Sequence, residues 1–343
     1  MSIETFVSEA RTASVAALGA LFIGDPHLSS RRPGRRRDAN FADTVLGKLA
    51  QCFELARDHQ WQPVILGDLF DRAGEQDLLV LSKLLRLLRD HLDAGGLLPV
   101  TIAGNHDLKD ADLSGDTALS VVHETGLLRV LDDAVPFLLR DPFGKVFAVL
   151  LPYSYGKESL LLEQGFDKTP WGDARIIALT HADFAFVGAY PGAKELVPIP
   201  GVDMVVNGHM HKLCPAARRG NTLWWNPGNI TRMSLDCEKH APRAWSWEPG
   251  DDTLTGHILR HEAQVFDRTG VAVDPNRQGL QSALAEDAPL SSRFVALLKD
   301  QMEQEAPLTE DGSGILEEMQ AVCREQKVDP MVVDILKSLW ESQ

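Results

Sequence analysis

Five short apolar runs in this 343-residue chain each end in residues that can bind a metal. They read ALFIGDPH (20–27), VILGD (64–68), VTIAGNHD (100–107), IIALTH (176–181) and DMVVNGHMH (203–211). Continuous apolar runs of this kind are typical of strands that are buried on both faces of a sheet. We therefore expect five buried strands, each followed by a polar cluster.

Two helices are expected between the first three runs, because apolar residues recur there three or four positions apart. The recurring positions are Phe41, Val45, Leu46, Leu49 and Phe53 in the first interval, and Leu78, Leu81, Leu84, Leu85 and Leu88 in the second. The resulting order of strands and helices predicts an α/β fold. In such folds ligands bind at the carboxyl ends of the strands, where all five polar clusters fall.

Strand and turn patterns return after the fifth run. TLWWNPGN (222–229) and RAWSWEPGDDTLTGHIL (243–259) predict further strands, joined by turns, that close a sandwich around the site. Beyond them, Gly, Pro, Asn and Asp mix without a clear period until helical patterns begin. We therefore divide the chain into a mobile or helical lead-in (1–18), a main domain (19–262), a linker (263–284) and a C-terminal helical segment (285–343).

The net charge of −15 decides little about nucleic acid, although phosphate binding favours a basic face. Residues 281–343 hold 13 acidic and 5 basic side chains, so they carry −8 of this charge and leave −7 on the first 280 residues. Bound divalent cations would neutralise several of the remaining carboxylates. The acidic balance therefore does not exclude DNA as a partner.

The cysteines and the apolar content favour a cytoplasmic protein without a membrane span. The four cysteines are scattered and form no CxxC pair, which suits free thiols in a reducing compartment. The longest apolar stretches stop short of the roughly 18 residues that a bilayer-spanning helix needs. The first residues also lack the basic start and apolar centre of a secretion signal.

The polar clusters offer oxygen and imidazole ligands without cysteine. Seven candidate ligands follow the strands: Asp25, His27, Asp68, Asn105, His181, His209 and His211. In an extended segment alternate side chains share a face, so His209 and His211 can reach one point in space. Mixed oxygen and imidazole ligands suit manganese, iron or zinc better than calcium or magnesium alone. Seven ligands suffice for two ions that share a bridging carboxylate.

Together, five motifs resemble those of the calcineurin-like metallophosphoesterases. They are D-x-H (25–27), G-D-x-x-D (67–71), G-N-H-D (104–107), a lone histidine after a strand (His181) and G-H-x-H (208–211). All five are present in the order of that family, and the resemblance covers roughly residues 19–260. It implies a four-layer αββα sandwich, here with a short C-terminal helical extension.

The resemblance also implies a role for each residue. One divalent ion would be held by Asp25, His27, Asp68 and His211, and the other by Asp68, Asn105, His181 and His209. His106 would stabilise charge on the scissile phosphate or protonate the leaving oxygen, while Asp107 orients it. Asp71 would either support a ligand or only anchor its own loop. Mn²⁺ is the expected ion, with Fe²⁺, Mg²⁺ and Zn²⁺ as alternatives.

Four stretches are similar to the SbcD-type DNA exonucleases. They are GDPHLSSRRPGRRRDANFADTVLGKLAQC (24–52), GDLFDR (67–72), LPYSYG (151–156) and WNPGNITRMSLDCE (225–238), the last with Asn229 where serine is common. Protein phosphatases of the superfamily usually carry GDxxDRG and GNHE, whereas Ala73 and Asp107 end those motifs here. The similarity implies a DNA phosphodiesterase, an exonuclease or end-processing nuclease of DNA repair or recombination, in which a metal-activated water attacks the phosphodiester.

Five arginines lie in the loop that follows the first metal motif: Arg31, Arg32, Arg35, Arg36 and Arg37. Their closeness to that motif in the sequence favours contact with DNA phosphates near the scissile bond. The alternative is a solvated loop, or one that is tethered to acidic residues elsewhere in the chain.

Partners are expected as well, because the chain has no G-x-x-x-x-G-K-[ST] motif of its own for ATP. SbcD-type nucleases act with an SMC-like ATPase of the SbcC type, which they bind through a C-terminal helical segment, and a homodimer is a further expectation. The amphipathic helices expected in 285–343 would either dock such a partner or pack on the main domain. Two other functions stay open: a stand-alone phosphodiesterase for a nucleotide or another small ester, and an inert scaffold for the ATPase.

Overall fold

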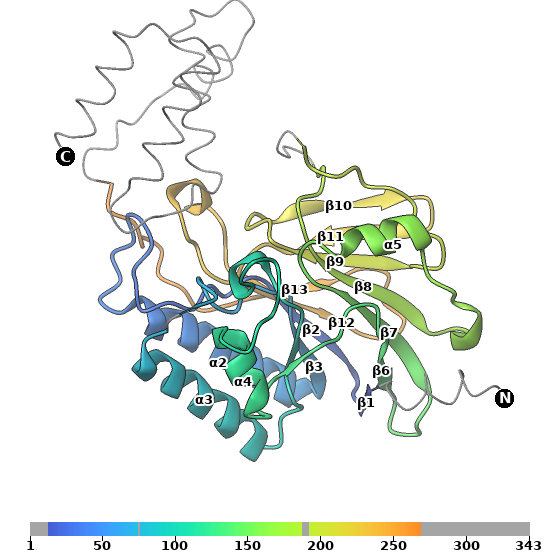
Figure 1. Cartoon of the computed structure of the whole chain (residues 1–343), viewed down its shortest axis with the longest axis horizontal. Helices are drawn as coiled ribbons and strands as arrows, with labels where there is room; N and C mark the ends of the chain where they lie inside the picture. The colour runs from blue at the N-terminus through green and yellow to red at the C-terminus, as the bar shows by residue number, and fades with distance from the viewer. Residues whose placement is uncertain (1–12, 75, 187–191, 269–343) are drawn as a thin grey trace, which may run out of the picture. The chain divides into compact units, whose positions relative to one another are not determined.

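Two β-sheets form the centre of the computed structural model, which describes residues 13–74, 76–186 and 192–268 (Figure 1). The seven-stranded sheet has the order β1 (Ala13–Ala16), β6 (Phe137–Arg140), β7 (Val146–Tyr153), β8 (Arg175–His181), β9 (Met204–Gly208), β11 (Thr222–Asn226) and β10 (Cys214–Arg219). The six-stranded sheet has the order β13 (Thr255–Ile258), β12 (Arg243–Trp247), β2 (Gly19–Ile23), β3 (Trp61–Ile65), β4 (Val100–Thr101) and β5 (Arg129–Val130).

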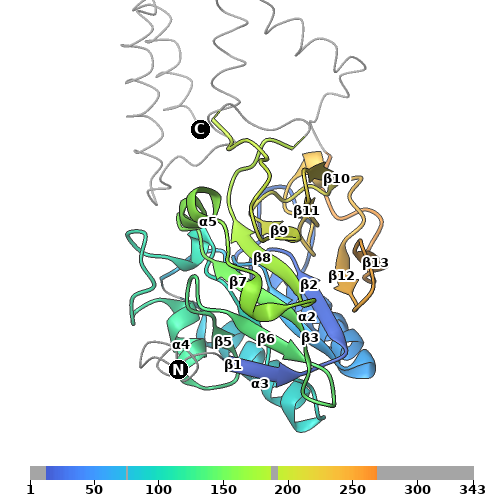
Figure 2. The same cartoon turned by 90° about the vertical axis from the view of Figure 1, so that its right-hand side faces the viewer.

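Helices cover the outer face of each sheet. Helices α2 (Phe41–His59), α3 (Leu78–Asp93) and α4 (Ala118–Glu124) pack on the six-stranded sheet, and α5 (Glu158–Gln164) packs on the other (Figures 1 and 2). The predicted four-layer αββα sandwich is therefore confirmed. The predicted C-terminal helical segment lies outside the described residues.

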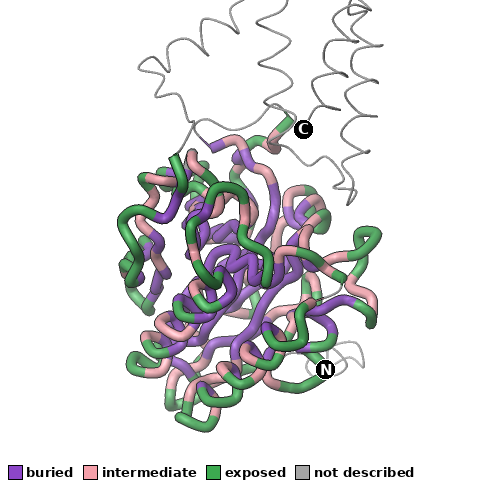
Figure 3. The backbone as a smooth tube through the Cα atoms, turned by 90° about the vertical axis from the view of Figure 1, so that its left-hand side faces the viewer, coloured by how far each residue is buried: buried purple, intermediate pink, exposed green. Residues whose placement is uncertain are grey.

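Alternation along the buried strands explains why their sequences are apolar without a break. In β2, Leu21 and Ile23 face α2 and α3, while Ala20 and Phe22 face the other sheet. In β8, Ile177 belongs to the layer between the sheets, and its neighbours face the outer layer. Each central strand is buried on both faces, and the buried segments run through the middle of the molecule (Figure 3).

Local capping defines where the two long helices begin. The side chain of Asn40 accepts a hydrogen bond from the amide of Asp43 at the start of α2, and Asp77 accepts from two amides at the start of α3. Such caps satisfy amides that have no partner within the helix. Within the described ranges, no helix has the length and apolar sequence that crossing a bilayer requires.

The ends of the main domain differ from their predicted limits. Part of the predicted lead-in, Ala13–Ala16, forms edge strand β1, which pairs in parallel with β6. Its small residues are only alternately half-buried, so the sequence carries a weak strand signal. At the other end, Val265 and Phe266 are buried, and Phe266 pairs with Arg36. The first residues of the predicted linker therefore pack on the domain, and its remainder from 269 lies outside the described residues.

Lys48 on α2 is a buried cation whose replacement we expect to stabilise the fold. Burial, together with the charges of Arg232 and Arg36, lowers the pKa of Lys48 from 10.5 to about 8. Folding therefore disfavours its charged form, and Lys48→Met should raise the free energy of unfolding at pH 7 by about 2 kcal/mol. The lost hydrogen bond to the carbonyl of Arg260 is included in that figure.

Urea unfolding at pH 7 and pH 9.5 tests this expectation. Between pH 8 and 10.5 the unfolded chain holds the Lys48 proton more tightly than the folded chain, so wild-type stability should rise there relative to the variant. The difference in free energy of unfolding between wild type and Lys48→Met should therefore be smaller at pH 9.5 than at pH 7. Lys145→Met, at an exposed position, is the control. A Lys48→Met protein that is less stable than wild type at pH 7 would refute the expectation.

Candidate metal centre

All seven predicted ligands lie at or just beyond the ends of β2, β3, β4, β8 and β9; His181 is the last residue of β8 and the others follow their strands. Strands β2, β3 and β4 run parallel in one sheet, and β8 and β9 run parallel in the other. Contacts between ligands from the two sheets show that these strand ends meet. The Nε2 atoms of His27 and His211 lie 2.8 Å apart, and Asp68 Oδ2 lies 3.2 Å from His181 Nε2.

The first group of ligand atoms comes from His27, Asp68 and His211, which lie close enough together to hold one ion. His27 Nε2 is 3.5 Å from Asp68 Oδ2 and faces His211 Nε2. Two imidazole nitrogens that face each other can share only one hydrogen, whereas a cation between them would use both lone pairs. The arrangement of this group fits a metal ion.

The second group comes from Asp68, His181 and His209. Asn105 lies beside it: its Oδ1 is 3.2 Å from His181 Nε2 and 2.9 Å from His209 Nδ1. Asp68 therefore belongs to both groups, as a bridging carboxylate would. Asp25 completes the cluster, because its Oδ1 is 3.6 Å from His181 Nδ1 and accepts a hydrogen bond from the amide of His209.

Burial shows that this donor set suits metal ions. The side chains of Asp25, His27, Asp68 and His181 are at most 1% exposed. Among the described residues, Asp25 Oδ2 is buried without a hydrogen-bond partner. Because an unpaired buried carboxylate oxygen is costly, a bound cation is its natural partner. A Cβ at position 104 would collide with Asp68 Oδ1, so only glycine fits beside the bridge.

The electrostatics of the cluster differ from ligand to ligand. Burial raises the pKa of Asp68, but the charges of His181 and His27 outweigh it and keep the carboxylate ionised. Burial, followed by the charge of His27, lowers the pKa of His211 well below its ordinary value, which leaves a neutral imidazole. Burial also lowers the pKa of His181, but the charge of Asp68 outweighs it and raises this pKa to about 9, so His181 must lose a proton when it binds a metal.

Four of the predicted ligands adopt left-handed backbone conformations. Asp25, His27, Asp68 and His209 have φ values of 33°, 49°, 48° and 72°. Such values are uncommon for residues other than glycine and cost roughly 1–3 kcal/mol each. The strain turns the chain sharply at each strand end, so that the side chains point into one cluster.

His106 lies against both groups without belonging to the ligand set that was predicted. Its amide donates to Asp68 Oδ1, and its ring Nδ1 is 2.8 Å from the carbonyl oxygen of Asp71. Because a carbonyl only accepts, Nδ1 carries a hydrogen and the other nitrogen, Nε2, is left for substrate. The Asp71 carboxylate is 3.6 Å from His27 Nδ1, which favours the alternative in which it supports a ligand.

Asp107 differs from its predicted role. Its carboxylate accepts from the backbone amides of Leu69, Phe70 and Gly104, whereas the carbonyl of Asp71 orients His106. Asp107 is fully buried and ties the loop after β3 to the loop after β4. It is therefore a positioning residue for Asp68 and Asn105 rather than the partner of His106. The sequence shows only that Asp107 follows His106, and adjacent side chains need not touch.

Asp107→Ala is expected to destabilise the protein by about 3 kcal/mol or more. The substitution leaves three backbone amides without their acceptor, and each unsatisfied buried donor costs roughly 1–3 kcal/mol. Chemical denaturation in EDTA measures the effect without bound metal. Asp107→Asn, which keeps one acceptor oxygen, should lose less. Equal stability of the alanine variant and wild type would contradict this role.

The structure separates Arg36 from the other four arginines of the loop. Arg36 is 3% exposed, its guanidinium binds both carboxylate oxygens of Asp38, and it donates to the carbonyl of Arg232. This corrects the expectation that Arg36 contacts DNA, because its donors are used inside the protein. Arg31, Arg32, Arg35 and Arg37 are exposed.

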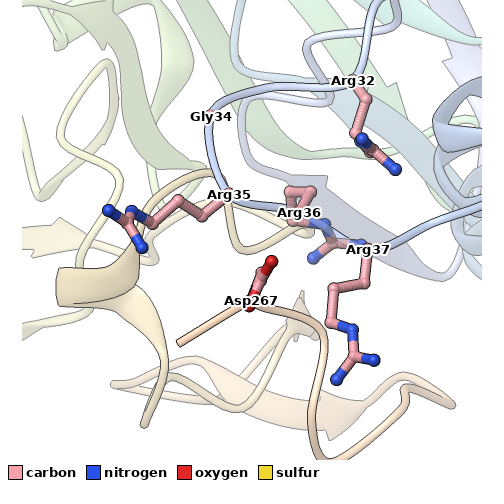
Figure 4. A pocket seen from close by; sticks show the side chains of 6 residues that line it. All are labelled: Arg32, Gly34, Arg35, Arg36, Arg37 and Asp267. Atoms are coloured by element: carbon pink, nitrogen blue, oxygen red, sulfur yellow. The ribbon is translucent and has the colours of Figure 1, made fainter. Parts of the chain in front are cut away.

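Three of the exposed arginines, Arg32, Arg35 and Arg37, line a pocket together with Gly34, Arg36 and Asp267. Figure 4 shows Arg32, Arg35 and Arg37 extending from the loop in different directions, with Asp267 between the last two. The pocket encloses about 540 Å³, and backbone hydrogen bonds from Arg37 to Val265 and from Asp267 to Arg35 hold the loop in place. The loop therefore has a fixed backbone and a fan of cationic side chains.

Two residues near the centre were not predicted from the sequence. Asp183 Oδ2 is 3.2 Å from His209 Nε2, and the ring of Tyr155 lies 5.6 Å from that of His209. Asp183 follows His181 by two positions just past the end of β8, so alternation along an extended chain could have indicated it. Tyr155 lies in the loop after β7, which carries no metal-binding motif.

Solved structures share limited similarity with this chain. TT1561 of Thermus thermophilus is similar over 71% of this chain and 100% of its own, with 12% identity and a TM-score of 0.44. A putative 5′-nucleotidase from Staphylococcus aureus in complex with alpha-ketoglutarate is similar over 73% of this chain and 56% of its own, with 12% identity and a TM-score of 0.38. The comparison with curated proteins gave no match. The family model for calcineurin-like phosphoesterases matches residues 20–213, more than half of the chain, and the chain therefore belongs to this family of metal-dependent hydrolases.

Proposed function

We propose that this chain is a DNA phosphodiesterase of the SbcD type, an exonuclease or end-processing nuclease that uses two divalent ions. Mn²⁺ is the ion that we expect. The observation that carries the proposal is the loop with four exposed arginines that follows the first metal motif in the sequence. Its backbone is held by residues 265–267, and it begins four residues after His27.

The spread of the arginines favours an extended substrate. A small phosphoester presents one phosphate, which guanidinium groups would have to surround from several sides. The side chains of Arg32, Arg35 and Arg37 instead diverge from the loop (Figure 4). Cations that are spaced along a surface suit successive phosphates of a nucleic-acid backbone, where they release condensed counterions. This difference supports DNA over a nucleotide or another small ester.

The residues of the cluster divide the chemistry between them. Asp25, His27, Asp68 and His211 would hold one ion, and Asp68, Asn105, His181 and His209 the other. When bound, the two ions acidify water and neutralise charge on the phosphate. His106 Nδ1 donates to the carbonyl of Asp71, so when the ring is doubly protonated its Nε2 is the nitrogen that would give a proton to the leaving oxygen or stabilise charge on the phosphate.

Two partners belong to the proposal. DNA would follow the arginine loop into the metal cluster, and an SMC-like ATPase of the SbcC type would supply the ATP-driven movement for which the chain has no motif. The proposed contact with the ATPase falls on residues 285–343, outside the described residues.

A cleavage assay with Mn²⁺ on end-labelled single- and double-stranded DNA tests the proposal, with Asp68→Ala to exclude contaminating nuclease. Metal-dependent shortening that disappears in the variant is the expected result. If the DNA stays intact while a small phosphodiester is hydrolysed rapidly, the protein is instead an enzyme for a nucleotide or another small ester. A metal-loaded protein that hydrolyses neither would indicate the scaffold function.

Salt dependence of DNA binding tests the arginine loop separately. The logarithm of the DNA-binding constant falls linearly with the logarithm of the salt concentration, and each lost phosphate contact makes this slope less steep by about 0.9 for duplex DNA. Arg32→Ala combined with Arg37→Ala should therefore reduce the slope by about 2 and leave turnover of a small phosphodiester unchanged. Arg86→Ala combined with Arg89→Ala removes two exposed arginines from α3 and is the matched control. If the two double variants show the same salt dependence, the DNA does not contact Arg32 and Arg37.

A further inference from the structure

His181 has an oxygen against the ring nitrogen that is turned away from Asp68. Its Nδ1 is 2.7 Å from the carbonyl oxygen of Leu66, while its Nε2 is 3.2 Å from Asp68 Oδ2. An oxygen at this position fixes the tautomer and the orientation of a metal-binding histidine and makes the other nitrogen a better ligand.

His209 shows the same arrangement with a residue outside every motif. Its Nε2 is 3.2 Å from Asp183 Oδ2, while its Nδ1 is 2.9 Å from Asn105 Oδ1 and faces the second ligand group. The backbone amide of His209 donates to Asp25 Oδ1, so the ring can move mainly by rotation about its side-chain bonds. A contact at Nε2 removes that freedom.

We propose that Asp183 is a positioning residue for the second metal ion: its carboxylate holds His209 so that Nδ1 is presented beside Asn105, and it strengthens that nitrogen as a ligand. The inference rests on the two-metal centre of the proposed function. It assigns a role to a residue that the five family motifs do not contain, and it concerns the second ion alone.

The position of Asp183 suits this role. Its carbonyl accepts a hydrogen bond from the amide of Lys194, and its neighbour Phe184 is buried and forms a bridge with the same lysine. The backbone of Asp183 is therefore anchored beside the end of β8. The side chain is 45% exposed, so an ion pair here would add little stability by itself. Its effect should accordingly appear in metal binding rather than in folding.

Calorimetric titration of the EDTA-treated full chain with Mn²⁺ tests the proposal. In Asp183→Ala we expect one of the two sites to lose about 10- to 100-fold in affinity, the range for loss of such a supporting group, while the other site changes less than twofold. Asp183→Asn keeps an oxygen that can accept from Nε2 but removes the charge, so its loss should be smaller. Asp173→Asn changes an exposed carboxylate at the opposite end of β8 and should titrate as wild type.

Thermal unfolding of the metal-free proteins separates positioning from folding, because all three variants should unfold at the wild-type temperature. Asp183→Ala that binds both ions as wild type does would overturn the proposal, and so would a wild-type protein that binds a single equivalent. If Asp183→Ala fails to fold, Asp183→Asn decides the question by the same titration. Wild type that binds two ions but leaves DNA intact would contradict the nuclease proposal and leave the role of Asp183 standing.

Discussion

Asp68→Ala is expected to lose both metal ions and at least about 1,000-fold in phosphodiester hydrolysis. Asp68 is the only residue shared by the two groups of ligand atoms at the ends of the sheets. Metal ions contribute several kcal/mol of charge stabilisation in the transition state, and each 1.4 kcal/mol or so corresponds to a factor of about ten in rate. Loss of the shared carboxylate should therefore affect both subsites at once.

Metal analysis after dialysis, together with turnover of a small phosphodiester, measures the two effects. Asp90→Ala removes an exposed carboxylate from α3 and should keep both metal content and rate. Asp25→Ala is a useful comparison. Asp25 would bind only one of the two ions, so this variant should lose that ion and keep the other. Retention of two ions by Asp68→Ala would show that Asp68 does not bridge them.

The two-sheet fold could be predicted largely because its central strands are buried on both faces. A strand such as β8 must then be apolar throughout, and the polar residue that ends the run marks the edge of the sheet. Parallel strands place those ends together, so polar residues that are far apart in the sequence become neighbours. The edge strand β1 has neither property: its small residues are alternately half-buried, and its sequence resembles a loop.

Contacts of side chains beyond the ligand set could not be predicted in the same way. Arg36 and Arg37 are adjacent and chemically identical, yet Arg36 is buried on Asp38 while Arg37 is exposed. The difference arises from the bridge between Arg36 and Phe266, a pairing between distant segments. Asp107 likewise binds amides of the loop after β3, because the turn at 105–107 directs its carboxylate away from His106. Sequence patterns indicate which residues can do chemistry, and tertiary pairing decides which of them are used for structure.

His106→Ala is expected to keep both metal ions and to lose about 100- to 10,000-fold in the rate of DNA hydrolysis. The ring is 4.8 Å from that of His27 and is held by the carbonyl of Asp71, so it lies beside the ligands without being needed to hold an ion in either group. General acid catalysis by a positioned histidine contributes factors of this size. Turnover and metal content, measured on the same preparation, test both halves of the expectation.

The leaving group distinguishes the two roles open to His106. If Nε2 donates a proton to the leaving oxygen, the loss should be much smaller for a p-nitrophenyl phosphodiester, because nitrophenolate leaves without protonation. If His106 only stabilises charge on the phosphate, both substrates should lose the same factor. His106→Gln keeps a donor of similar reach and should restore part of the rate only in the second case. An emptied metal site in His106→Ala would contradict both roles and make His106 a ligand, because His27, Asp71 and His106 also offer ligand atoms close enough together to hold an ion.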